Sequence, residues 1–191
     1  MLALSAMRFQ TGSASIALHC HPATPSRAIH KIDVSVTATG AGGLALAFAL
    51  HGELRDVRVP EWCGASRRGE DLWRHTCCEV FAMAGDGPGY REYNFSPSGE
   101  WAVYAFRGYR DGGALEVGFD PGIAVRRSEA RLELDAEIGE AFLPAGGRLR
   151  LGLSAVVEDG DGNLSYWCLR HPPGRPDFHH RDAFALRPAP S

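Results

Sequence analysis

The chain has 191 residues, of which 45% are hydrophobic and 23% are charged, proportions typical of one folded domain with its own core. The formal net charge of −3 argues against a general nucleic-acid binder, which would carry a basic excess. The 23 glycines and 12 prolines exceed the average share of these residues and predict many turns and short elements.

The N-terminus and the cysteines indicate the compartment. No apolar run reaches the ~20 residues that a membrane helix needs, and the first residues lack the basic start and long apolar stretch of a signal peptide. The five cysteines form no CxxC motif: Cys20, Cys63, Cys77, Cys78 and Cys168. We therefore expect free thiols in a cytoplasmic protein with no membrane attachment, and frayed ends at residues 1–10 and 187–191.

Apolar residues recur at every second position in most of the chain, which is typical of β-strands. In chain order, we expect strands at 32–37, 44–50, 54–59, 78–83, 90–95, 101–106, 123–127, 132–138, 148–158 and 163–169. Glycine-rich turns at 40–43 and 159–162 join two pairs of these strands into hairpins. Helical patterning is confined to a short helix around 70–73 and one turn within 137–143. Strands at this spacing predict one all-β domain over residues 1–191, a sandwich or a barrel.

Polar and aromatic residues crowd around two of the expected strands. Alternation places Glu79 on one face of the first strand, and Glu92 and Asn94 on one face of the second. If these strands pair, the three side chains converge on one patch, and Trp73 is close enough in the chain to wall it. A flat aromatic ring beside carboxylates and an amide suits a sugar, because the ring packs on C–H groups while the polar groups bind hydroxyls.

A purely structural interpretation explains the same residues. Trp73, Trp101 and Trp167 can be core aromatics, and the carboxylates can pair with the many arginines. The same choice applies to a group of four arginines, which either binds an anionic ligand or neutralises nearby acids. These are Arg67, Arg68, Arg107 and Arg110.

Three separated motifs carry a resemblance to a known family: LWRHTCCEVF (residues 72–81), YREYNFSPSGEWAVYAF (90–106) and SYWCLRHPPGRPDFHH (165–180). Together with YRDGG (109–113) they resemble the bacterial DOMON-like family, whose domains are similar to family 9 carbohydrate-binding modules. The resemblance spans about residues 54–184. It implies a jelly-roll-like β-sandwich of two antiparallel sheets.

Sugar-binding modules similar to this chain build their site from a Trp, a Glu on the next strand and polar residues on the following strand. Trp73, Glu79, Glu92 and Asn94 lie at matching places. The chain departs from the pattern near Glu92, where those modules carry a positive residue and this chain is acidic. A second aromatic wall is also implied, and Trp167 or Phe178 could supply it.

The wider superfamily also includes haem-binding domains that hold the iron with a Met and a His. Here Met83 and His171 are the residues available, although a lone Met in a strand usually packs in a core. Two enzyme alternatives remain open as well. Glu79 and Glu92 form a carboxylate pair of the kind that hydrolases use. Asp177 and His179, with His171 and His180 nearby, are ligand types that suit a metal, unless Asp177 caps a turn and pairs with Arg175 or Arg181.

From these observations we predict a non-catalytic domain, without a cofactor, that binds a small ligand, a carbohydrate or a related polar metabolite. The expected ligand-binding residues are Trp73, Glu79, Glu92, Asn94, Arg110 and His171. The alternatives are a haem-binding domain, a metal-dependent or carboxylate-pair hydrolase, and an interaction scaffold without a ligand. The sequence leaves the oligomeric state open.

Overall fold

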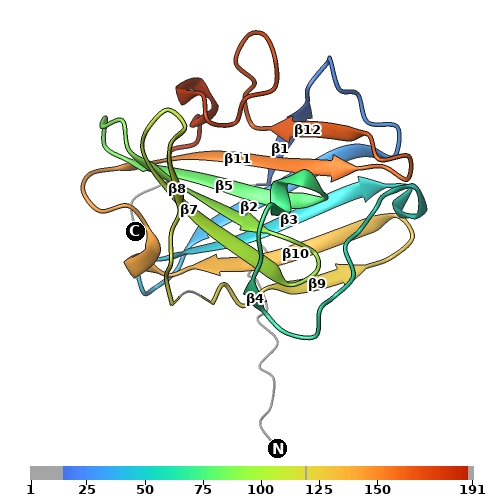
Figure 1. Ribbon diagram of the computed structural model, residues 1–191, viewed down its shortest axis with the longest axis horizontal. Coiled ribbons are helices and arrows are strands. Elements are labelled where there is room, and N and C mark those ends of the chain that lie inside the picture. The colour runs from blue at the N-terminus through green and yellow to red at the C-terminus, as the bar shows by residue number, and fades with distance from the viewer. Residues whose placement is uncertain (1–14, 119, 189–191) are drawn as a thin grey trace, which may run out of the picture.

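The computed structural model of the protein describes residues 15–118 and 120–188. Strands dominate this part of the chain, and the helices are single 3₁₀ turns (Figure 1). The strands are β1 (Ile16–Cys20), β2 (Ile29–Ala38), β3 (Leu44–Gly52), β4 (Arg67–Arg68), β5 (Cys77–Ala84), β6 (Tyr90–Phe95), β7 (Glu100–Gly108), β8 (Asp111–Ala114), β9 (Ala124–Arg127), β10 (Arg131–Ile138), β11 (Leu149–Glu158) and β12 (Leu164–Cys168). The 3₁₀ turns are η1 (Leu54–Asp56), η2 (Leu72–Arg74), η3 (Glu140–Phe142) and η4 (Arg181–Ala183). The predicted all-β class is confirmed.

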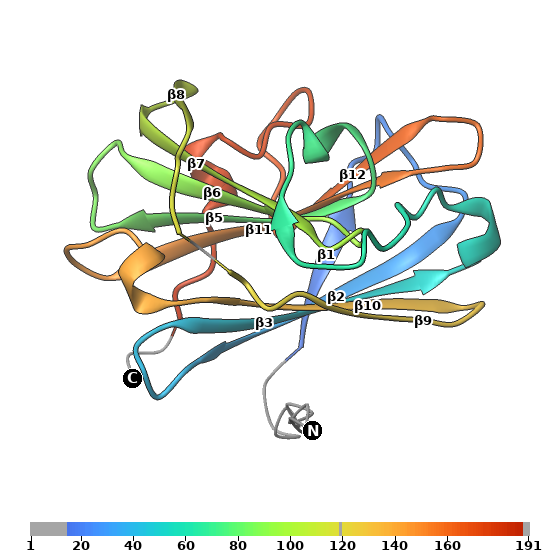
Figure 2. The ribbon, with the colours of Figure 1, turned by 60° about the horizontal axis from the view of Figure 1, so that its bottom comes forward.

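The strands form one continuous sheet in the order β4-β7-β6-β5-β11-β12-β1-β2-β3-β10-β9, with β8 paired to β7. The sheet curls over on itself so that its two arms face each other (Figure 2). We call β2, β3, β10 and β9 the lower arm, and β12, β11, β5, β6, β7, β4 and β8 the upper arm. Strand β1 joins them, because residues 16–18 pair with β2 and residues 19–20 pair with β12.

This connectivity changes the expectation of two separate antiparallel sheets. The shared strand β1 makes the two arms one hydrogen-bonded structure, and β4 runs parallel to β7, so the sheet is mixed. Most other features of the strand prediction hold. The two expected hairpins are β2–β3 and β11–β12.

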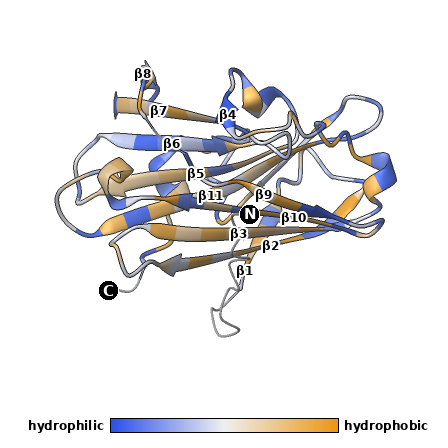
Figure 3. Ribbon diagram, turned by 90° about the horizontal axis from the view of Figure 1, so that it is seen from below, coloured by the Kyte–Doolittle hydropathy of each residue, from blue (hydrophilic) through white to orange (hydrophobic). Residues whose placement is uncertain are grey.

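The core lies between the facing surfaces of the two arms. In β3 buried and half-buried residues alternate along the strand, as expected when one face packs inward. Val34, Phe48 and Leu134 of the lower arm belong to the same buried cluster as Val80 and Tyr93 of the upper arm. Figure 3 shows β3 and β5 largely in the hydrophobic colour, whereas β6 is mostly hydrophilic although it lies within the upper arm.

The outer face of the upper arm is covered by residues 170–186, which we call the C-terminal cover. Leu186 exchanges two backbone hydrogen bonds with Leu151 of β11, at 2.8 and 3.0 Å, close to where the pairing of β11 with β12 ends. Gly152 permits the close approach, since a Cβ at this position would lie 3.3 Å from the carbonyl oxygen of Ala183. Phe184 anchors the cover, with its ring centroid 5.9 Å from that of Phe81.

Two parts of the sequence prediction need correction, and a third lies mostly outside the described residues. The strand expected at 54–59 is instead the 3₁₀ turn η1, followed by an isolated bridge at Val57, because Leu54 and Val57 are three residues apart and both are buried. Strands β1, β4 and β8 were not expected. The fraying predicted at 1–10 and 189–191 lies outside the described residues, whereas 187 and 188 are described. Within 15–118 and 120–188, no helix is long and apolar enough to cross a membrane.

Candidate functional site

A cavity of about 900 Å³ lies on the outer face of the upper arm, beneath the C-terminal cover. Residues from β5, β6, β7 and β12 form one side of it, and residues 172–180 of the cover form the other. Trp73, Glu79, Glu92 and Arg110, which the sequence singled out, all line this cavity. Four residues that lie between positions 73 and 110 of the chain are therefore brought together by the pairing of neighbouring strands.

The floor of the cavity is formed by Glu79 and Glu92, and Glu79 belongs to a polar row that continues across the sheet outside the cavity lining. Glu79 of β5 is directly opposite Asn94 of β6 on one side and Ser154 of β11 on the other. All three side chains are buried, at 0–2% exposure. Glu79 Oε1, Asn94 Oδ1 and Ser154 Oγ have no hydrogen-bond partner among the described residues. Because buried polar atoms are rarely left unpaired, the open carboxyl oxygen of Glu79 in the cavity lining indicates a place for a polar ligand.

Burial also sets the protonation of the two glutamates. The pKa of Glu79 is raised well above its ordinary value by burial, and further by the nearby carboxyl of Glu92. Burial raises the pKa of Glu92 to about 7, although the hydrogen bond from Asn94 and the charge of Arg110 act in the opposite direction. Both carboxyls therefore hold their protons more tightly than solvated carboxyl groups do.

Asn94 does not line the cavity but supports a residue that does. Its Nδ2 donates a hydrogen bond to Glu92 Oε1 at 2.9 Å. Since both residues are buried on β6, two positions apart, this bond fixes the orientation of the Glu92 carboxyl toward the cavity. In this geometry Asn94 positions Glu92, and its predicted hydrogen bond to a ligand stays a prediction.

His179 of the cover faces Glu92 from above. Tyr90 Oη accepts a hydrogen bond from the backbone N–H of Arg110 at 3.0 Å and lies 2.9 Å from His179 Nδ1. We assign the hydroxyl proton to the bond with Nδ1, which leaves the ring proton on Nε2, 3.6 Å from Glu92 Oε2. Burial, with the charge of Arg110, lowers the pKa of His179 to about 4, so the ring is neutral at neutral pH.

Asp177 holds the rim of the cavity together. Its Oδ1 accepts from Arg110 at 3.0 Å and from the backbone N–H of His179 at 3.2 Å, while its Oδ2 accepts from Tyr109 at 2.8 Å. Burial raises the pKa of Asp177, but the hydrogen bonds from Tyr109 and Arg110 outweigh it and lower that pKa below its usual value. An ionised Asp177 thus ties the C-terminal cover to the turn between β7 and β8.

Aromatic rings form most of the wall. Trp73 stands on η2, which is anchored by the buried side chain of Leu72 and leaves the indole 43% exposed. The guanidinium of Arg74 lies 5.0 Å from the Trp73 ring centroid. The remaining rings that line the cavity are Tyr104, Phe106, Tyr109, Tyr166 and Phe178. The second aromatic wall is thus supplied by Phe178 among others, whereas Trp101 and Trp167 are buried in the core.

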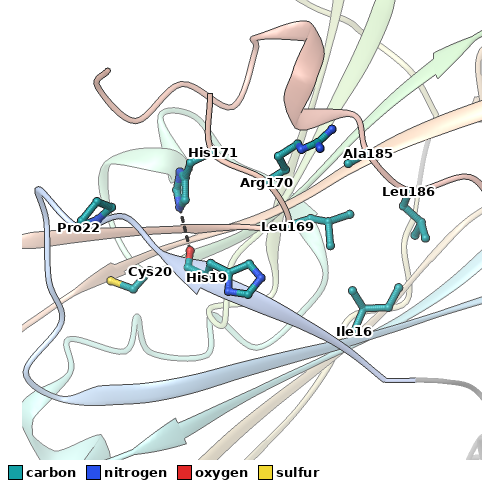
Figure 4. Close-up of a pocket in the computed structure, with 9 residues that line it drawn as sticks. All are labelled: Ile16, His19, Cys20, Pro22, Leu169, Arg170, His171, Ala185 and Leu186. Atoms are coloured by element: carbon teal, nitrogen blue, oxygen red, sulfur yellow. Dashed lines mark hydrogen bonds between the residues drawn. The ribbon is translucent and has the colours of Figure 1, made fainter. Parts of the chain in front are cut away.

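His171 does not reach this cavity. It lines a separate groove of about 630 Å³ between β1 and the cover, where its Nε2 donates to the carbonyl oxygen of His19 at 2.8 Å (Figure 4). Its ring meets that of His21 edge to face, with centroids 4.7 Å apart, and His21 Nε2 lies 3.1 Å from the carbonyl oxygen of Gly174. His171 thus lies outside the cavity lined by Glu79 and Glu92 and anchors the segment that continues into the cavity wall; its predicted contact with a ligand stays a prediction.

The haem and metal alternatives receive no support from the positions of their residues. Met83 is buried in an apolar cluster with Phe81, Phe178 and Phe184, whereas His171 lies in the separate groove. Asp177 uses both of its oxygens in the hydrogen bonds of the rim. Within the described part of the chain, no group of three His, Cys, Asp or Glu side chains is arranged to hold a metal ion.

The four arginines of the sequence pattern are all paired with acids. Arg67 contacts Glu100, Arg68 contacts Glu116, Arg107 contacts Asp111 and Arg110 contacts Asp177. Neutralisation of nearby carboxylates, rather than a cluster for an anionic ligand, is the arrangement observed.

Sequence reasoning missed the tyrosines of the wall. Tyr104 is directly opposite Glu92 in the β6–β7 register, and Tyr166 alternates with the core residue Trp167. Strand alternation could have placed both on the outer face, but the register that joins them to Glu92 and Glu79 is not visible in the sequence.

Comparison with known proteins extends the description of the fold. No known family's sequence profile matches the chain, and no curated protein matches it. A solved structure from Bacteroides uniformis, of a protein named as a candidate carbohydrate-binding protein, is similar with a TM-score of 0.65 and 14% identity. The match covers 90% of this chain and 84% of that one. At this identity the likeness shows a shared fold, and the resemblance to the DOMON-like family stays a prediction.

Proposed function

We propose that this chain binds a small polar ligand, a carbohydrate or a close relative of one, in the cavity beneath the C-terminal cover. The observation that carries the proposal is the unpaired, buried carboxyl oxygen of Glu79 in the lining of a cavity that is walled by aromatic rings. Hydroxyl groups of a sugar would complete the hydrogen bonds of the floor while its C–H faces pack against the rings. The similar fold of a candidate carbohydrate-binding protein supports the same class of ligand.

In this proposal each residue of the cavity has a separate role. Trp73 stacks on the ligand with the ring face that Arg74 does not cover. Glu79 and Glu92 bind hydroxyl groups, and Asn94 positions Glu92. Arg110 shapes the rim through its ion pair with Asp177. The volume of about 900 Å³ fits a mono- or disaccharide rather than a long polymer.

The test is a calorimetric titration of the purified protein with neutral mono- and disaccharides. We expect saturable binding that Trp73→Ala and Glu79→Gln each weaken about tenfold or more, equivalent to about 1.4 kcal/mol. Trp62→Ala is the matched control, because Trp62 is similarly exposed, at 49%, but does not line the cavity.

Two further results decide the outcome. Recovery of the sugar unchanged after incubation distinguishes binding from hydrolysis by the Glu79–Glu92 pair. If folded Trp73→Ala and Glu79→Gln proteins bind every sugar as the wild type does, the cavity is not the binding site.

A further inference from the structure

The floor of the cavity is acidic, with two carboxyls on one face. Glu79 on β5 is opposite Asn94, and Glu92 precedes Asn94 by two residues on β6, so the two glutamates are diagonal neighbours across the strand pair. Their side chains are only 2% and 5% exposed. Both line the same cavity, so a single ligand group can meet both carboxyls at once.

Two arginines line the cavity, but neither forms an ion pair with the glutamates of the floor. The Arg110 guanidinium pairs with Asp177, although its charge lowers the pKa of both glutamates, and Arg175 is exposed on the cover. The neutral ring of His179 approaches Glu92 at 3.6 Å, which is beyond hydrogen-bond distance. Among the described residues, no lysine or arginine forms an ion pair with Glu79 or Glu92.

Such an arrangement is costly for the folded protein. A buried carboxylate without a partner loses several kcal/mol of hydration, and two neighbouring carboxylates also repel each other. A protein of this kind is stabilised either by protons on the carboxyls or by a cation that arrives with the ligand. Burial raises the pKa of both Glu79 and Glu92, which favours the protonated form of each carboxyl.

The wall of the cavity suits a cation as well. Tyr104 stands directly opposite Glu92, and Tyr166 and Trp73 are among the other rings that line the space. The face of an aromatic ring attracts an ammonium group, and the attraction grows when both are shielded from water. The carboxyls of the floor and the rings of the wall therefore both offer favourable contacts to an ammonium group.

We propose that this cavity selects sugar-sized ligands that carry a protonated amine, with the ammonium group held between the carboxyls of Glu79 and Glu92. The inference rests on the proposed function, because it names the chemistry of the ligand for the same cavity.

The charges around Glu92 set the expected dependence on pH. The ionisable groups that face it are Glu79 from β5, Cys77 from β5, Tyr90 from β6, Tyr104 from β7, Arg110 from the β7–β8 turn, and Asp177 and His179 from the cover. Of these, only Glu79 shares with Glu92 a raised carboxyl pKa. Since an ammonium group favours ionised carboxylates, its binding must release protons to the solvent when the amine is already protonated.

The experiment compares ligands that share one ring and differ in one substituent. The wild-type protein is titrated at about pH 6.5 with glucose, N-acetylglucosamine, glucosamine and 6-amino-6-deoxyglucose. We expect at least one amino sugar to bind about tenfold or more tightly than both neutral sugars. Calorimetry in two buffers of different ionisation enthalpy should show release of about one proton per bound amine.

Variants assign the preference to the two carboxyls. Glu79→Gln and Glu92→Gln should each reduce the preference for the amine toward unity. Glu133→Gln, an acid on the outer face of the lower arm, should leave it unchanged. The proton count requires only the wild-type protein, so the proposal stays testable if a variant fails to fold.

The possible results separate the two proposals. Equal affinity for amino and neutral sugars, or amine binding without proton release, overturns the inference and leaves sugar binding in place. Absence of binding to all four compounds and to the disaccharides overturns the proposed function together with the inference.

Discussion

The two arms of the sheet have similar alternating sequences but very different outer faces. In β3 of the lower arm, buried and half-buried residues alternate along the whole strand. In β5 of the upper arm, every residue from Cys77 to Met83 is buried, because the C-terminal cover and η2 pack over the face that would otherwise meet water. The outer carboxylates differ accordingly: Asp135 of the lower arm pairs with Arg126 at 2.7 Å, whereas Glu79 has no cation.

The difference shows that a polar residue in a strand acquires its chemistry from what covers it. On the lower arm the carboxylate of Asp135 is also buried, at 7% exposure, but it is paired with Arg126, whose side chain is 55% exposed. On the upper arm the buried glutamates form no ion pair with a lysine or arginine among the described residues, and their burial raises pKa values and leaves polar atoms unpaired. The cover therefore converts an ordinary outer face into a candidate binding site.

The largest effect should follow from loosening the cover. Phe184→Ala removes a fully buried ring that packs on Phe81 and Tyr90, with centroids 5.9 and 5.3 Å away. We expect a loss of about 3–5 kcal/mol in the free energy of unfolding, as for other buried aromatic residues. Urea unfolding measures this loss, and ligand affinity should fall with it because residues 172–180 form the cavity wall.

The matched control lies on the uncovered face of the lower arm. Ser35→Ala changes a half-buried outer residue of β2 and should alter stability by less than about 0.5 kcal/mol. A Phe184→Ala protein as stable as this control would contradict the view that the cover is packed onto the sheet.

The covered face also explains which features of the site could be predicted from the sequence. Alternation placed Glu79, Glu92 and Asn94 on one face because it depends on neighbours in the chain, and Trp73 was close enough in sequence to be included. The role of β1 as the link between the arms depends on pairing over more than a hundred residues, which no local pattern encodes. The same limit applies to His171, since its distance from the cavity is set by its hydrogen bond to His19.

A smaller effect should appear in the pH dependence of stability. The pKa of Glu92 is about 7 in the folded protein, above its ordinary value of about 4.3, so the folded state holds this proton more tightly. The stability that this bound proton gives is fully present below about pH 4.3 and is lost as the pH rises through about 7. We expect the wild type to lose about 1 kcal/mol more than Glu92→Gln between about pH 6.5 and 8.5.

Thermal melts across this range measure the effect, as a difference of several degrees in Tm. His179 does not contribute to the change between about pH 6.5 and 8.5. Its pKa is lowered in the folded protein, so the stability that it gives rises with pH only up to about 6.5, the ordinary pKa of histidine. Glu133→Gln is the control, because the hydrogen bond from Arg126 holds the pKa of Glu133 below its usual value. Parallel pH profiles for Glu92→Gln and the wild type would show that Glu92 is ionised throughout.

A third change tests the hydrogen bonds beneath the cover. Tyr90→Phe removes the hydroxyl that accepts from the Arg110 backbone and contacts His179, so two partly buried hydrogen bonds are lost. We expect a loss of about 1–2 kcal/mol by urea unfolding. Tyr109→Phe removes an exposed hydroxyl that donates to Asp177 and should cost less than about 0.5 kcal/mol. Equal costs for the two variants would mean that water reaches Tyr90 as freely as Tyr109.

The smallest effect is expected for the ion pair on the uncovered arm. Asp135→Asn removes a carboxylate that accepts from Arg126, whose side chain is 55% exposed and keeps a second partner in Glu133 at 2.8 Å. Because the guanidinium remains solvated and paired, we expect a loss of about 0.2–1 kcal/mol, which should shrink further in about 1 M salt. Urea unfolding at low and high salt measures both quantities. A loss above about 2 kcal/mol that salt does not reduce would place Asp135 in the same class as the glutamates of the upper arm, and exposure of the outer face would then no longer distinguish the two arms.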